Sequence, residues 1–326
     1  MDTERLPDPN HLAHRIVVPT PYRVGPANVY AFDAGPVMLF DCGPNTPAAE
    51  NALRLGLAEH GLAFEQVARV VISHGHPDHY GLAPTIQRAS GATVYVGEHD
   101  LPKINERASR FATGALLMEA GVPVDLLVEM DQERKRTRKL HPKVEDAVPL
   151  AGKERFAFDR FTLEVLHLPG HTSGHVCLLE PDRRVLFAGD TLLAHITPNP
   201  LLEPTPDDPT IRRKSLMEYM RTLDVLESLE LTLVWTGHGE PIQDPAATIR
   251  RIKEHHVLRK EEVASRLDDQ PVSPFEVAMA MFRDLEGFDN FLAVSEVVAH
   301  LDLLEEEGRV ERLVEGGVTR YRRVSD

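Results

Sequence analysis

The pattern of apolar and polar positions predicts an α/β arrangement over the first three-quarters of the chain. Short apolar runs, broken by Pro and Gly, are typical of strands and occur at 16–18, 28–32, 37–40, 67–72, 93–96, 161–168, 175–179, 184–188 and 231–235. The run at 67–72 is continuously apolar, which predicts a buried strand. Helices are expected over 47–59 and from Pro209 to about Ser228.

After Asp244-Pro245 the pattern changes from strands to helices. Helices are predicted near 246–268, 274–283 and 291–307, followed by a hairpin over 309–324 that turns at Gly316-Gly317. Three helices closed by a β-hairpin are typical of a winged-helix module. We therefore predict two domains, 1–245 and 246–326, with the boundary near residue 245.

A helical, highly charged stretch at about 100–140 interrupts the first domain. It is predicted to be an inserted helical pair that covers the functional edge of the domain. Four apolar residues in this insertion are expected to supply a wall of the substrate pocket: Phe111, Leu116, Leu117 and Met118. The alternative is that these residues pack the insertion against itself or against a second subunit.

The composition argues against several classes of protein. The 326 residues include 36 Lys plus Arg and 51 Asp plus Glu, a net charge of −15 that argues against a protein built to coat nucleic acid. Cys42 and Cys177 are expected to be small buried hydrophobes, because two distant cysteines form neither a disulfide scaffold nor a clustered zinc site. The acidic N-terminus and the absence of an apolar run of ~18 residues predict a cytoplasmic protein without a membrane segment.

Histidine and aspartate gather where five predicted strands end. These residues are Asp41, His74, His76, Asp78, His79, His171, Asp190 and His238. Strand ends hold side chains rigidly and direct them to a common edge of a sheet. Imidazole and carboxylate suit zinc, iron or manganese, and four donors within positions 74–79 match two neighbouring metals better than one.

In this order, the motifs resemble those of the metallo-β-lactamase superfamily. The central His-x-His-x-Asp-His motif stands at 74–79, and His171, Asp190 and His238 lie in Pro-Gly-His-Thr, Gly-Asp-Thr and Thr-Gly-His-Gly segments. The resemblance covers about 15–245. It implies a four-layer αβ/βα sandwich of the α/β (α+β) class that binds two divalent metal ions per chain, with zinc expected and iron or manganese as alternatives.

The resemblance also implies a role for each of these residues. His74, His76 and His171 would hold the first metal, whereas Asp78, His79 and His238 would hold the second, with Asp190 bridging the pair. Asp41 would hydrogen-bond the ligand groups and fix their tautomers. Asp78 would also orient a metal-bridging hydroxide, so Asp41 and Asp78 are the predicted catalytic residues. His167 and His195 are candidates for a proton donor, although each is more readily explained as pointing away from the site.

Three activities are compatible with this ligand set. The first is a binuclear hydrolase of a small carbonyl substrate, such as a thioester or a lactone. The alternatives are a metal-dependent ribonuclease and a mono-iron sulfur dioxygenase. The region 246–326 has 12 Lys plus Arg and 17 Asp plus Glu, so its net charge of −5 argues against nucleic acid, although five arginines fall on the predicted hairpin. We expect this module to pack against the catalytic domain or to form homodimer contacts.

Overall fold

Two mixed β-sheets face each other in the structure, a computed structural model that describes residues 12–105, 110–285 and 287–324. The first sheet has the order β1-β2-β3-β4-β5-β6, with antiparallel pairing from β1 to β3 and parallel pairing from β3 to β6. Its strands are β1 (His14–Val18), β2 (Ala27–Phe32), β3 (Val37–Phe40), β4 (Val67–Ile72), β5 (Thr93–Gly97) and β6 (Val148–Leu150).

The second sheet has the order β11-β10-β9-β8-β7. All its pairs are antiparallel except β10 with β11. Its strands are β7 (Arg155–Ala157), β8 (Thr162–His167), β9 (Val176–Glu180), β10 (Val185–Gly189) and β11 (Leu233–Thr236). The predicted strands are therefore present, while β6 and β7 escaped prediction because three-residue strands carry too little periodicity to be read.

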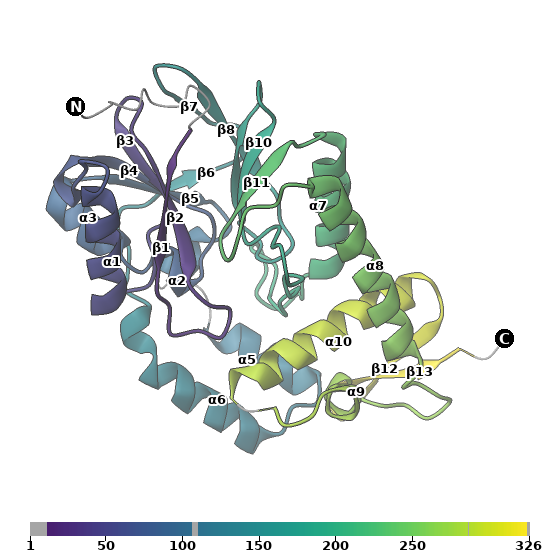
Figure 1. Cartoon of the computed structure of the whole chain (residues 1–326). Helices are drawn as coiled ribbons and strands as arrows, with labels where there is room; N and C mark the ends of the chain where they lie inside the picture. Colours follow the sequence, from purple (N-terminus) through teal and green to yellow (C-terminus); the bar gives the residue numbers. More distant parts are fainter. Residues whose placement is uncertain (1–11, 106–109, 286, 325–326) are drawn as a thin grey trace.

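Helices cover the outer face of each sheet, so the fold has four layers (Figure 1). Aromatic and aliphatic side chains such as Phe32, Leu163 and Phe187 fill the space between the sheets. The first sheet carries α1 (Pro47–Ala58) and α3 (Ala83–Ser90), and the second carries α7 (Ser215–Ser228) and α8 (Pro245–Ala264). This arrangement confirms the predicted αβ/βα sandwich.

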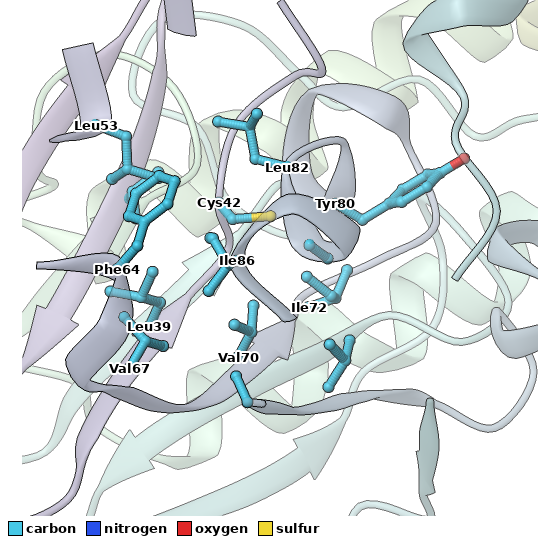
Figure 2. Close-up of a cluster of buried hydrophobic side chains, with 14 of the residues drawn as sticks. Leu39, Cys42, Leu53, Phe64, Val67, Val70, Ile72, Tyr80, Leu82 and Ile86 are labelled. Atoms are coloured by element: carbon cyan, nitrogen blue, oxygen red, sulfur yellow. The ribbon is translucent and has the colours of Figure 1, made fainter. Parts of the chain in front are cut away.

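The core beneath α1 and α3 shows how the outer layer is attached (Figure 2). Leu53 from α1 and Ile86 from α3 pack on the strand residues Leu39 and Val70, and all four are fully buried. Cys42 lies in the same cluster, and its thiol donates to the carbonyl of His79. Cys177 is equally buried beneath α7, so both cysteines are free and act as small core residues, as predicted.

Shorter helices complete the fold. They are η1 (Phe64–Gln66), α2 (Pro77–Tyr80), α4 (Leu101–Ile104) and η2 (Arg138–Leu140). Helix α7 begins at Ser215, so the prediction that it starts at Pro209 is wrong. Pro204 and Arg212 instead form an isolated bridge, and this irregular segment is held by hydrogen bonds between Thr205 and Asp208.

The helical insertion packs against the C-terminal part of the chain. It contains α5 (Arg110–Glu119) and α6 (Val124–Arg136), and the C-terminal part contains α9 (Pro274–Met281), α10 (Phe288–Glu306), β12 (Val310–Glu315) and β13 (Val318–Arg323). Both parts contribute to one apolar cluster, and α5 and α10 cross below the sandwich in Figure 1. The expected order of three helices and a hairpin is present.

This packing changes the interpretation of the insertion. Leu116 and Leu117 are buried in the cluster shared with α9 and α10, so they do not form a wall of a substrate pocket. Met118 points outward and is 53% exposed. The side chain of Phe111 lies outside the described residues. Within the described ranges, none of the helices combines the length and apolar character needed to cross a membrane.

Replacing Leu117 by Ala should lower the free energy of unfolding by about 2–5 kcal/mol, because a buried leucine loses its contacts and leaves a cavity. Met118, the next residue of the same helix, is largely exposed, so Met118→Ala is the matched control. This variant should change the free energy of unfolding by less than about 0.5 kcal/mol. Denaturant unfolding measures both values. Equal effects would contradict the packing of α5 on the C-terminal helices.

Candidate metal centre

The predicted site residues meet at one edge of the sandwich, where five strands end. Asp41 follows β3, residues 74–79 follow β4, His171 follows β8, Asp190 follows β10 and His238 follows β11. Asp41 has a positive φ of 61°. Its backbone N–H donates a hydrogen bond to the Val71 carbonyl at 2.8 Å, which holds the residue in this conformation. The structure therefore brings together every residue of the predicted set.

Three imidazole nitrogens converge in the first half of the centre. His76 Nδ1 lies 2.8 Å from His74 Nε2 and 3.1 Å from His171 Nε2. His171 Nδ1 donates to the Asn199 carbonyl at 3.2 Å, and His74 Nδ1 donates to Ser73 Oγ at 3.0 Å, since the Ser73 hydroxyl donates to Asp41 at 2.8 Å. These partners leave Nε2 of both His74 and His171 as bare lone pairs.

Two further histidines are held in the same way in the second half. His79 Nδ1 donates to Asp41 Oδ2 at 2.8 Å, and His238 Nδ1 donates to the Pro26 carbonyl at 2.9 Å. The Nε2 atoms of both rings therefore face inward, where each can bind a proton or a metal ion. Both atoms are buried without a hydrogen-bond partner among the described residues.

The Asp190 carboxylate lies between the two halves. Its Oδ1 is 3.6 Å from His79 Nε2, and its Oδ2 is 3.6 Å from His238 Nε2 and 3.9 Å from His171 Nε2. Asp78 Oδ2 lies 3.5 Å from His238 Nε2. These separations exceed hydrogen-bond lengths but suit two ligands of one cation, each at roughly 2.0–2.2 Å.

The ionisation of the buried groups differs between the two halves. Burial and the neighbouring imidazoles hold the pKa of His74 well below its usual value, so this ring stays neutral. Burial also opposes protonation of His79, but the carboxylates of Asp190, Asp41 and Asp78 outweigh it and raise its pKa. The same negative field favours any cation placed between these groups.

The donor set fits divalent metal ions. A cation would satisfy the polar atoms that converge in this buried space, because His79 Nε2, His238 Nε2 and Asp190 Oδ1 have no other partner among the described residues. Gly237 keeps this space open, because a Cβ there would lie 2.3 Å from Asp190 Oδ1. Two donor triads, His74/His76/His171 and Asp78/His79/His238, lie on either side of Asp190.

Sequence reasoning missed Asp100, which joins two of the turns. This fully buried carboxylate accepts hydrogen bonds from Gly75 N at 2.8 Å, Thr172 Oγ1 at 2.6 Å and Gly174 N at 3.0 Å. Lys103 Nζ lies 2.9 Å from Asp100 Oδ1. Although burial opposes ionisation, Lys103 and the hydrogen bonds hold the pKa of Asp100 well below its usual range. The turns carrying His76 and His171 are thus fastened to one anion.

His175 was also missed, although it follows His171 in the sequence His-Thr-Ser-Gly-His. Its Nε2 accepts from the Asp190 backbone N–H at 3.1 Å, and its Nδ1 lies 3.0 Å from Thr191 Oγ1. Burial lowers its pKa to about 3. His175 and the Thr191 hydroxyl therefore support the Asp190 turn.

The two candidate proton donors lie outside this cluster. His167 Nε2 donates to the Ser173 carbonyl at 2.8 Å, which explains the residue as a support of the His171 turn. His195 is exposed beside Gly239. Neither belongs to the group of His and Asp residues that could hold a metal ion.

An αβ/βα sandwich with a His and Asp centre at the open edge of its sheets defines a metal-dependent hydrolase. Residues 22–238 match the model of the metallo-beta-lactamase superfamily, and residues 260–324 match that of the metallo-beta-lactamase-like C-terminal domain. The chain belongs to the metallo-beta-lactamase superfamily.

Relatives resemble the chain over almost its whole length. A probable metallo-hydrolase of Bacillus subtilis, YqjP, is 32% identical over 319 residues, covering 94% of this chain and 96% of the relative. A metallo-beta-lactamase family protein from Thermus thermophilus superposes with a TM-score of 0.82 at 32% identity, covering 96% and 98% of the two chains. An atrochrysone carboxyl ACP thioesterase of Emericella nidulans is 22% identical, covering 97% and 87%.

Replacing Asp100 by Asn should weaken metal binding by about 10- to 100-fold, because the amide must turn its NH₂ toward the N–H of Gly75 or of Gly174. Competition with a chromogenic chelator measures the affinity. Asp33→Asn, at a half-exposed carboxylate paired with His14, is the control and should leave the affinity unchanged. Affinities within twofold for both variants would contradict a positioning role for Asp100.

Proposed function

We propose that the protein is a binuclear metal-dependent hydrolase that cleaves a small acyl substrate of the thioester or lactone type. The observation that carries the proposal is the position of Asp190 between two donor triads whose imidazole nitrogens face inward. When bound, two divalent cations, with zinc as the expected metal, would acidify a shared water and polarise the substrate carbonyl.

The chain's own residues prepare the reaction in three ways. His74, His76 and His171 would hold one cation, Asp78, His79 and His238 the other, and Asp190 both. Asp41 holds His79 in the tautomer whose Nε2 is free to bind. The Asp78 carboxylate would accept a hydrogen bond from the attacking water and thereby orient it.

The substrate class is inferred from the relatives and from charge. The relative named a thioesterase shares most of its length with this chain, which supports acyl transfer to water. Cations near the centre are already paired: Lys103 Nζ lies 2.7 Å from Glu203, and Arg213 Nη1 lies 2.8 Å from the same carboxylate. A neutral carbonyl group fits these surroundings better than a polyanion.

The observations favour a hydrolase of small molecules over a ribonuclease. Arginines near the hairpin are paired with carboxylates: Arg309 with Glu261 at 2.6 Å, Arg322 with Glu311 at 2.6 Å and Arg320 with Glu276 at 3.0 Å. A module that binds phosphates would leave such cations free. A sulfur dioxygenase that binds one iron would use fewer donors than the seven assembled at this edge.

We also propose that the C-terminal module is of the winged-helix class and has a structural role. Its three helices precede a two-stranded hairpin, and its apolar faces pack on the helical insertion. The buried pair of Arg212 with Asp302 joins it to the segment before α7. Two free, buried cysteines accord with a reducing compartment such as the cytoplasm.

Metal analysis tests the two-metal centre. The purified chain should bind two equivalents of zinc, and His238→Ala should retain at most one, since the second triad loses a ligand. Hydrolysis should fall by at least about 100-fold in this variant. His60→Ala, at an exposed histidine stacked on His14, is the control and should keep two metals. One iron per chain, with oxygen consumption, would instead indicate the dioxygenase.

A substrate panel tests the reaction class. The metal-loaded chain should hydrolyse thioesters or lactones, and removing the metal with a chelator should abolish the activity until the metal is restored. Phosphodiesters and β-lactams complete the panel and should be cleaved at least about tenfold more slowly. Turnover of single-stranded RNA with a steep salt dependence would overturn the acyl assignment in favour of the ribonuclease.

A further inference from the structure

The loop between β1 and β2, residues 19–26, borders the second half of the metal centre. The Pro26 carbonyl at its end accepts the hydrogen bond from His238 Nδ1 at 2.9 Å. The next residues continue the attachment, because Ala27 forms a bridge with His238 and the Asn28 N–H donates to the Gly237 carbonyl at 2.7 Å. The position of this loop is therefore coupled to that of a predicted metal ligand.

Hydrogen bonds and one ion pair hold the loop in a defined conformation. The Thr20 hydroxyl donates to the Gly25 carbonyl at 2.6 Å and accepts from the Tyr22 N–H at 3.3 Å. Gly25 has a φ of +96°, which a side chain would disfavour. Arg23 Nη1 lies 2.6 Å from Asp289 Oδ2, which fastens the loop to the start of α10. Tyr22 is thus positioned without the help of its own hydroxyl.

The Tyr22 hydroxyl is buried and has no hydrogen-bond partner among the described residues. Burial and the neighbouring Asp78 carboxylate raise the pKa of this phenol, so it stays protonated and can donate a hydrogen bond. Tyr80 is a further neighbour, and Figure 2 shows its hydroxyl directed away from the apolar cluster beneath α1 and α3. The orphan donor therefore belongs to the loop that is hydrogen-bonded to the His238 half of the centre.

Two other buried tyrosines of the fold have a hydrogen-bond partner for the hydroxyl. Tyr30 donates to the Thr236 carbonyl at 2.6 Å, and Tyr219 donates to the Thr191 carbonyl at 2.8 Å. A buried hydroxyl without a partner is unfavourable, and phenylalanine would fill the same space without this cost. A structural role thus explains Tyr30 and Tyr219 but leaves the hydroxyl of Tyr22 unexplained.

We propose that the Tyr22 hydroxyl donates a hydrogen bond to an oxygen of the acyl substrate bound beside Asp78, an inference that rests on the proposed function. Exposed apolar side chains on the same loop and at the start of α10 suit a neutral substrate with an apolar acyl group. Val24 and Phe288 adjoin the Arg23–Asp289 pair in sequence and are 37% and 56% exposed. The ion pair neutralises the arginine, so the loop offers one donor and apolar surface rather than a net charge.

The variant Tyr22→Phe tests the inference with four measurements. On the thioester or lactone that the wild type hydrolyses, kcat/KM should fall about 10- to 100-fold, as expected for losing a donor to an oxygen that gains charge. Calorimetry should show weaker binding of an unreactive ketone analogue of that substrate, in which a CH₂ group replaces the ester sulfur or ring oxygen and the carbonyl oxygen is kept. The free energy of unfolding and the metal content should not fall, because the lost hydroxyl has no partner among the described residues.

Two control variants separate this role from tyrosine loss in general. Tyr95→Phe, on β5 away from the loop, should leave kcat/KM and analogue binding unchanged. Tyr219→Phe should lower the free energy of unfolding, because its hydroxyl has a backbone partner.

The possible results distinguish this inference from the proposed function. If Tyr22→Phe keeps kcat/KM and analogue affinity within twofold, the inference is overturned and the hydrolase assignment stands. Loss of metal or of stability in Tyr22→Phe would also overturn it, since the hydroxyl would then have a structural role. If the wild type hydrolyses none of the acyl substrates, the proposed function and this inference fail together.

Discussion

Four of the five inward-facing imidazoles at the centre depend on a hydrogen bond made by the other ring nitrogen. His74, His79, His171 and His238 all donate from Nδ1 to a hydroxyl, a carboxylate or a backbone carbonyl. These bonds select the tautomer whose Nε2 lone pair faces inward and prevent the ring from turning away. The fold thus holds Nε2 of His79 and His238 in a buried space without hydrogen-bond partners among the described residues, an arrangement that a bound cation would stabilise.

The acceptors of these hydrogen bonds come from separate parts of the chain. Pro26 belongs to the β1–β2 loop, Asp41 follows β3, and Asn199 lies in the segment between β10 and α7. The Asn199 side chain donates in turn to the Leu292 carbonyl of α10 at 3.1 Å. The C-terminal module therefore supports a predicted metal ligand through one intermediate residue, although it supplies none of the seven donors.

The strands and the candidate donors could be predicted because each is a short continuous pattern in the sequence, whereas the sandwich was predicted from the resemblance to a known family. The motif at 74–79 and the apolar strands around it are continuous in sequence. The supporting residues that sequence analysis missed make their contacts with residues far away in the sequence. Asp100 meets Thr172 over 72 positions, and nothing near either residue indicates the contact. The insertion was likewise visible as helical, but its packing against α9 and α10 depends on tertiary contacts that periodicity does not encode.

The charges around the centre are compensated within the protein. Asp100 pairs with Lys103, Lys103 with Glu203, and Glu203 with Arg213, so this chain of buried contacts leaves no unpaired cation among its members. Such a network stabilises the turns but has no charge available for a substrate. Selectivity must then arise from shape, from the bound cations and from uncharged donors at the rim. The β1–β2 loop is well placed to provide such donors, because it is fastened both to the His238 turn and to α10.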